Sequence, residues 1–152
     1  MKPDTFTQLL VHLVFAAYNR NIQLNKVHRT EVWKYMAGTI NGLGHKCIII
    51  NGYSNHVHIL LGLNPVMSIS DLVRDVKRSS ALFINNKHWF PYQFQWQEGY
   101  GAFSYSKSQL NQVYSYIQNQ EEHHRVKTFK EEYVELLTES GINYNERFLF
   151  NE

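Results

Sequence analysis

The chain has 152 residues, of which 43% are hydrophobic and 18% are charged, and its net charge is +2. This length and hydrophobic content predict one domain over residues 1–152 with a sizeable core, because neither a Pro/Gly/Ser-rich linker nor an internal repeat divides the chain. The net charge is too small to indicate nucleic-acid binding by itself.

Membrane and redox signals are absent from the sequence. No apolar stretch reaches the ~18 residues needed to cross a bilayer, and residues 1–6 lack the basic start and apolar core of a signal peptide. The one cysteine, Cys47, has no partner for an intramolecular disulfide and lies in an apolar run. We therefore expect a cytoplasmic protein without membrane contact or redox chemistry.

The first half of the chain predicts strands and helices in the order βαββα. Residues 7–15 are expected to form a buried strand, and residues 28–42 a helix that two glycines terminate. Strands at 46–50 and 56–63 flank a short glycine-containing loop, which is typical of a hairpin. Residues 68–84 then predict a helix that begins at a serine cap.

The second half adds one strand and further helices. A strand within residues 94–104 must bend near its glycines, and residues 108–125 and 127–137 predict two helices. The combined order favours an α+β, ferredoxin-like fold. Its antiparallel sheet would carry helices on one face, followed by a C-terminal helix that bears Tyr116.

Two histidines alternate along the predicted strand 56–63. Residues i and i+2 of a strand share a face, so His56 and His58 project side by side while Val57 and Ile59 enter the core. Two adjacent imidazoles supply half of a divalent-metal site. The alternative is that both are polar side chains on the solvent face of an amphipathic strand.

The predicted helix 108–125 carries a second group of polar residues. At about 100° per residue, Tyr114 lies near the apolar stripe and is expected in the core, whereas Tyr116 lies well away from it. Gln120 follows one turn later on the same flank, with His123 close to that line. Tyr116 is therefore a candidate functional residue, although a tyrosine in this position can also serve packing alone.

The ordered set of His56-Val57-His58 and Tyr116-x-x-x-Gln120 resembles the signature of the single-tyrosine HUH transposases, the small TnpA-type enzymes of insertion sequences with hairpin ends. Three further segments resemble that family in the same order, namely residues 10–15, 70–77 and 96–104. Ser54-Asn55 stands where many members have Pro followed by Asp or Asn, which alters the turn and leaves the chemistry intact.

The residue types predict metal-assisted attack on a phosphodiester. Neutral imidazoles of His56 and His58 suit Mn²⁺ and tolerate Mg²⁺, and the amide oxygen of Gln120 adds a hard ligand. The cation would polarise the scissile phosphodiester, and Tyr116 would attack as the nucleophile. A phosphotyrosyl bond conserves the phosphodiester linkage, so a free 3′-hydroxyl can rejoin strands without ATP.

The resemblance implies more than these residues show. It implies a DNA transposase, cytoplasmic and nucleoid-associated, that cleaves single-stranded DNA bearing a subterminal hairpin and becomes joined to the 5′ phosphate. It also implies a homodimer in which the histidine pair of one subunit works with the tyrosine helix of the other.

Candidate DNA contacts lie on the flank of the helix at 68–84. Arg74, Lys77 and Arg78 fall off its apolar stripe, and Lys107 is a further candidate. The alternative is an ordinary solvated helix face.

Other functions fit parts of the pattern. A replication initiator or relaxase uses the same metal and tyrosine, but this short chain has no helicase or origin-binding extension. A non-catalytic binder of single-stranded DNA or RNA would use aromatic residues for stacking. A non-haem iron oxygenase would need a carboxylate as third ligand, and none follows at the histidine pair itself.

Three more histidines are left with open roles. His12 either hydrogen-bonds at the border of the metal site or is an ordinary strand histidine. His123 either orients the tyrosine helix or contacts phosphate, and His124 is expected to pack near the apolar stripe.

Overall fold

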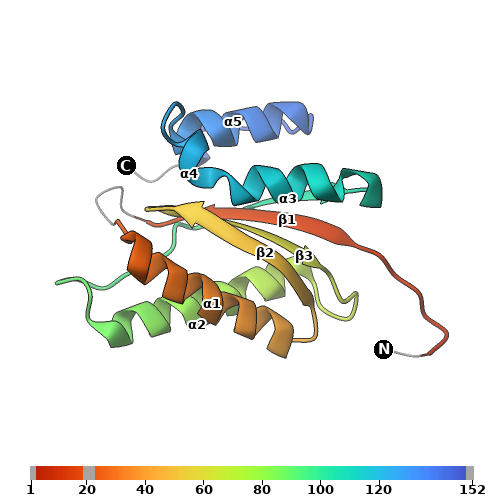
Figure 1. Ribbon diagram of the computed structural model, residues 1–152, viewed down its shortest axis with the longest axis horizontal. Coiled ribbons are helices and arrows are strands. Elements are labelled where there is room, and N and C mark those ends of the chain that lie inside the picture. Colours follow the sequence, from red (N-terminus) through yellow and green to blue (C-terminus); the bar gives the residue numbers. More distant parts are fainter. Residues whose placement is uncertain (1–2, 19–22, 150–152) are drawn as a thin grey trace.

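A four-stranded antiparallel sheet organises the computed structural model, which describes residues 3–18 and 23–149 (Figure 1). Its strand order is β2-β3-β1-β4, and each neighbouring pair is antiparallel. The strands are β1 (Leu10–Ala16), β2 (Lys46–Tyr53), β3 (His56–Gly62) and β4 (Gly101–Tyr105). This arrangement confirms the predicted α+β, ferredoxin-like sheet, whereas the predicted domain limits at 1 and 152 lie outside the described residues.

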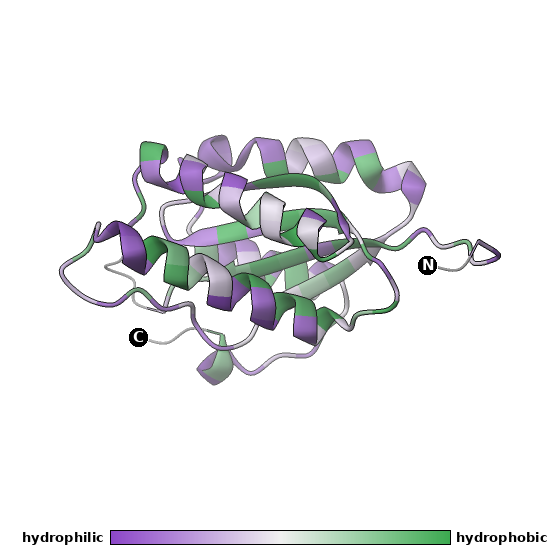
Figure 2. Ribbon diagram, turned by 90° about the horizontal axis from the view of Figure 1, so that it is seen from below, coloured by the Kyte–Doolittle hydropathy of each residue, from purple (hydrophilic) through white to green (hydrophobic). Residues whose placement is uncertain are grey.

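Two long helices, α1 (Lys26–Gly42) and α2 (Ile69–Lys87), cover one face of the sheet (Figure 1). Strand alternation sends every second residue of β1 and β3 toward them, and these side chains form one apolar cluster with both helices. Figure 2 shows hydrophobic strands behind helices whose outer sides are largely hydrophilic. Each large apolar side chain buried here contributes roughly 1.5–3 kcal/mol relative to exposure.

Three shorter helices cover the opposite face: α3 (Leu110–Gln118), α4 (Gln120–His123) and α5 (Phe129–Glu139) (Figure 1). Val113 and Ile117 of α3 pack on Leu60 of β3. Residues of α5 pack on β1 and β4 in a separate apolar cluster. Short 3₁₀ turns, η1 (Lys107–Gln109) and η2 (Glu146–Phe148), precede α3 and follow α5. The sheet therefore has helices on both faces.

The β2–β3 hairpin is tighter than predicted. β2 continues to Tyr53, so Ser54 and Asn55 alone form the turn. A Cβ atom on Gly52 would lie 2.2 Å from the carbonyl oxygen of His56, so this close pairing requires glycine. β4 begins only at Gly101, and in the preceding part of the predicted strand region Trp96 forms an isolated antiparallel bridge with Ala17.

The predicted helix 108–125 is interrupted at Asn119. The Asn51 side chain of β2 donates from Nδ2 to the carbonyl oxygens of Ile117 (3.1 Å) and Gln118 (3.0 Å). In an unbroken helix these carbonyls would accept from the following turn. Tyr114, predicted to be core, is 38% exposed, because α3 turns Val113 and Ile117 toward the sheet. None of the described helices is long and apolar enough to cross a membrane.

Candidate active site

The two histidines of β3 point away from the main apolar core. His56 is 1% exposed and His58 is fully buried, while Val57 and Ile59 enter the cluster under α1 and α2. The prediction that the pair shares one face is confirmed by this alternation. The alternative of solvent-facing histidines is wrong, because α3, α4 and α5 cover this face.

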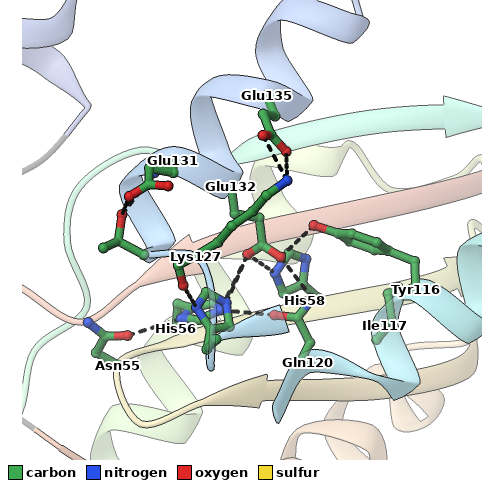
Figure 3. A network of polar contacts seen from close by, with 12 residues as sticks. Asn55, His56, His58, Tyr116, Ile117, Gln120, Lys127, Glu131, Glu132 and Glu135 are labelled. Atoms are coloured by element: carbon green, nitrogen blue, oxygen red, sulfur yellow. Dashed lines mark hydrogen bonds and ion pairs between the residues drawn. The ribbon is translucent and has the colours of Figure 1, made fainter. Parts of the chain in front are cut away.

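A carboxylate from α5 completes the histidine pair (Figure 3). Glu132 Oε1 lies 2.9 Å from His58 Nε2 and 3.5 Å from His56 Nε2. Sequence reasoning missed this residue. The sequence does contain a signal for Glu132. It lies one turn after Phe129 and one turn before Leu136, on the apolar stripe of the predicted helix 127–137. A glutamate on a buried stripe usually has a partner, because an unpaired charge is rarely buried.

The three side chains suit a divalent cation. Their donor atoms all lie within 4.8 Å of one another. Two ligands bound about 2.1 Å from one cation are separated by about 3.0–3.4 Å, which is close to the distances from Glu132 Oε1 to the two imidazole nitrogens. Two imidazole nitrogens with one carboxylate oxygen form a recurrent set for divalent transition metals. Among the described residues no lysine or arginine pairs with Glu132, so a cation would balance its buried charge.

Gln120 lies where the sequence predicted it, against the histidine pair. Its Oε1 is 3.1 Å from His56 Nε2, and its Nε2 donates to Glu132 Oε2 at 3.0 Å. The side chain is fully buried at the first position of α4. The amide oxygen therefore faces the candidate metal site while the amide nitrogen fixes the carboxylate.

Tyr116 of α3 reaches the same carboxylate from above the strand. Its hydroxyl donates to Glu132 Oε2 at 2.5 Å, and its ring lies edge-on to His58 at a centroid distance of 5.8 Å. Glu132 thus contacts the histidines through one oxygen and the phenol through the other (Figure 3). The tyrosine and the histidine pair meet within one chain.

Burial and the carboxylate set the protonation of the site. Burial raises the pKa of Tyr116 well above its usual value, and the nearby negative charge of Glu132 raises it further. Burial by itself would raise the pKa of Glu132, but hydrogen bonds from His124 and His58 hold it well below the usual range. Burial lowers the pKa of His56, which leaves a neutral imidazole with a lone pair for a metal.

Three further histidines surround these groups. His124 packs against the rings of Tyr53 and His56, as expected, and its Nε2 also lies 3.3 Å from Glu132 Oε1. His12 of β1 places Nε2 2.8 Å from His58 Nδ1. The ring of His123 packs on Tyr116 at 4.8 Å, and its Nε2 is the one buried side-chain nitrogen or oxygen among the described residues without a hydrogen-bond partner.

Comparison with known proteins decides the family. Residues 5–120, which include both histidines, Tyr116 and Gln120, match the family described as IS200-like transposases. The chain belongs to this transposase family. Glu132 lies beyond the last matched residue. No curated protein matches the transposase sequence.

Two solved structures share the fold of the transposase. A candidate transposase from Deinococcus radiodurans R1 is 22% identical with a TM-score of 0.63, over 79% of this chain and 96% of that one. The REP-associated tyrosine transposase bound to a REP hairpin is 12% identical with a TM-score of 0.60, over 82% of this chain and 74% of that one.

Three of the predicted DNA contacts of the transposase lie on α2, on the opposite face of the sheet from the histidine pair. Lys77 Nζ donates to the carbonyl oxygens of Gln97 (2.8 Å) and Gly99 (2.6 Å), and burial lowers its pKa to about 8. Lys77 therefore holds the segment before β4, and its role in DNA contact stays a prediction. Arg74 is exposed but pairs with two aspartates of its own helix. Arg78 and Lys107 are exposed.

The position of Glu132 bears on the alternative of a non-haem iron oxygenase. A non-haem iron oxygenase needs a carboxylate as third ligand, and although none follows the histidine pair in the sequence, the fold brings Glu132 to it. The residue types at the site therefore do not distinguish a non-haem iron oxygenase from a transposase. The family match places the protein among the transposases instead.

Proposed function

We propose that the protein is a metal-dependent single-stranded DNA endonuclease and transposase that uses Tyr116 as its nucleophile. The observation that carries the proposal is that the Tyr116 hydroxyl and the histidine pair contact the same buried carboxylate, Glu132. This shared contact supports the proposal, because a hydroxyl close to a bound cation would be well positioned to attack a phosphodiester that the cation polarises.

The side chains at the site have separable roles. His56 and His58 would hold Mg²⁺ or Mn²⁺ through Nε2, Glu132 through Oε1 and Gln120 through its amide oxygen. When bound, the cation supplies Lewis-acid polarisation of the scissile phosphate. Helices α3, α4 and α5 cover the site, and this burial strengthens its electrostatic interactions.

Cleavage joins the DNA to the protein. Tyr116 Oη forms a bond to phosphorus while the bond from phosphorus to the 3′ oxygen breaks, which leaves a 5′-phosphotyrosine and a free 3′-hydroxyl. The phenolic proton has an acceptor in place at Glu132 Oε2, and the departing 3′ oxygen takes a proton from water. Attack by another 3′-hydroxyl reverses these bonds, releases Tyr116 and completes strand transfer.

The proposed substrate is single-stranded DNA with a subterminal hairpin. The REP-associated tyrosine transposase, which shares the fold, is bound to a REP hairpin, and this supports the extension to the present chain. Arg74, Lys77, Arg78 and Lys107 are the proposed phosphate contacts. The side chains of all but Lys77, which is half-buried, are exposed. Such contacts would make binding weaken steeply as salt increases.

The homodimer with active sites shared between subunits is a separate proposal that rests on the resemblance. In the single chain, Tyr116 already reaches its own histidine pair through Glu132. Mixing His58→Ala protein with Tyr116→Phe protein distinguishes the arrangements. Restored cleavage in verified heterodimers supports a shared site, and a dead mixture of folded, dimeric variants supports a site within one chain.

The decisive experiment tests for a covalent adduct. The protein is incubated with labelled hairpin-bearing single-stranded oligonucleotides and Mn²⁺ or Mg²⁺, and denaturing gels report protein joined to DNA. We expect an adduct that requires metal and is absent in Tyr116→Phe, while Tyr114→Phe on the exposed side of α3 retains it. Metal-independent binding without any adduct would instead favour a non-catalytic nucleic-acid-binding module.

A further inference from the structure

His12 is a buried histidine for which the proposed reaction supplies no role. It is fully buried on β1 and faces the same side of the sheet as His58 on the adjacent strand. The two rings stack at a centroid distance of 5.0 Å. His12 Nε2 lies 2.8 Å from His58 Nδ1, and His12 Nδ1 lies 3.4 Å from the Tyr105 hydroxyl. His12 therefore links the candidate ligand His58 to a tyrosine of β4.

The short distance between the two imidazoles restricts their tautomers. A neutral imidazole has one N–H and one acceptor nitrogen, and a contact between two nitrogens at 2.8 Å needs one hydrogen between them. Whichever nitrogen of His58 carries the hydrogen thus decides which nitrogen of His12 carries its own. The two rings must change tautomer together or lose their hydrogen bond.

Without a cation, the hydrogen bonds run toward Glu132. When His58 is neutral and its Nε2 donates to the Glu132 carboxylate at 2.9 Å, His58 Nδ1 accepts from His12 Nε2. His12 Nδ1 is then an acceptor, and the Tyr105 hydroxyl is its donor. Every imidazole nitrogen in this chain of contacts has a partner.

With a cation bound at the candidate site, the direction of these hydrogen bonds would be reversed. Coordination uses the lone pair of His58 Nε2, so the hydrogen of a neutral His58 must sit on Nδ1 and be donated to His12 Nε2. His12 then carries its hydrogen on Nδ1 and donates to the Tyr105 oxygen. Both imidazoles stay neutral, and no nitrogen loses its partner.

We propose that His12 is a positioning residue that exchanges tautomer together with His58, so that His58 can present Nε2 to a cation inside a closed site. The inference rests on the proposed cation site and goes beyond it, because His12 would not touch cation or DNA. An imidazole suits this position because each of its two nitrogens can either donate or accept a hydrogen bond, depending on the tautomer. Phenylalanine would fill similar space and leave His58 Nδ1 without a partner.

The first test measures cation affinity in the full chain. Mn²⁺ is titrated into wild type and His12→Phe, with free Mn²⁺ followed by electron paramagnetic resonance. We expect binding to weaken about 10–100-fold, as is typical when the hydrogen-bond partner of a metal ligand is removed. His45→Phe is the matched control, because His45 is also buried but contacts Asn64 and Met67, away from the site. It should lower thermal stability and leave Mn²⁺ affinity unchanged.

The second measurement observes the tautomers directly. In protein labelled with ¹⁵N-histidine, long-range ¹H–¹⁵N spectra report which nitrogen of each ring carries hydrogen. Both His12 and His58 should change from Nε2–H to Nδ1–H when Mg²⁺ saturates the site. Wild-type affinity in folded His12→Phe, or a His12 tautomer that does not change on Mg²⁺ binding, would overturn the inference alone. Failure of wild type to bind Mn²⁺ would overturn the cation site itself.

Discussion

The two faces of the sheet differ in chemistry although the same strands build both. On the face toward α1 and α2, β1 and β3 contribute apolar side chains to one core: Val11, Leu13, Phe15, Val57, Ile59 and Leu61. On the face toward α3, α4 and α5, the alternate positions of these strands include His12, His56 and His58. One face stabilises the fold, and the other holds the candidate active site.

The difference shows two ways of burying a side chain. Burial of apolar groups is non-directional, so each position on the first face contributes largely by its own area and packing. Each buried polar group on the second face needs a partner with correct geometry, and one carboxylate, Glu132, serves several of them. We therefore expect substitutions on the apolar face to change stability and those on the polar face to change chemistry.

Removing the charge of Glu132 should produce the largest effect. Glu132→Gln keeps the shape of the side chain but removes the negative charge that Oε1 presents to His56 and His58 and Oε2 presents to Tyr116. We expect Mn²⁺ affinity and the rate of adduct formation each to fall by roughly 100-fold or more, beyond what loss of an indirect partner causes. Titration and single-turnover assays measure both.

Glu135→Gln is the control for this change, since Glu135 lies on the same helix and pairs with Lys127 on the surface. It should behave as wild type. If Glu132→Gln retains full cation affinity and adduct formation, the carboxylate is not part of the site.

Leu13→Ala tests the apolar face. Leu13 is fully buried between the sheet and the helices, so its truncation should lower the free energy of unfolding by about 2–5 kcal/mol. Cleavage per folded molecule should be retained, because the side chain points away from the histidines. Urea denaturation and the adduct assay measure the two quantities, and Leu82→Ala, at a 61% exposed position, is the control. Loss of cleavage in fully folded Leu13→Ala would contradict the assignment of stability to one face of the sheet and chemistry to the other.

Acid should destabilise the polar face in the cation-free protein. Burial lowers the pKa of His12 and His56 below the ordinary value of 6.5, so the unfolded chain binds protons at a pH where the folded chain does not. The free energy of unfolding should therefore fall as pH drops below 6.5, by up to about 1.4 kcal/mol per pH unit for each histidine. Denaturation between pH 8 and 5 measures this slope, which His12→Phe should reduce. An identical slope in that variant would contradict the assignment.

Asn51→Ala should have the smallest effect. Its amide binds the last carbonyls of α3 and so helps to set where Tyr116 lies over the site. We expect a loss of about 1 kcal/mol in stability and a reduced rate of adduct formation with unchanged Mn²⁺ affinity. Asn41→Ala is the control, because Asn41 also binds a backbone group, the amide of Cys47, but lies away from the site. Equal rates in both variants would assign Asn51 to stability alone.

Local sequence patterns predicted much of the fold and part of the candidate site. Period-two alternation placed His56 and His58 opposite the core, because alternation follows from strand geometry alone. Helical spacing predicted that Tyr116 and Gln120 share one flank. The same spacing wrongly predicted Tyr114 in the core and an unbroken helix across Asn119. The break depends on Asn51, which is distant in the sequence, so helical periodicity could not predict it.

The sequence by itself determined the strand and helix order, the shared face of the histidine pair and the flank of the tyrosine, since these depend on backbone periodicity. Tertiary structure decided which residues complete the site. Glu132 and His12 meet His58 only because α5 docks on the sheet and β1 pairs with β3. Helical periodicity showed which side of α5 is buried, but not which residues that side would face, because docking depends on side chains from many separate segments.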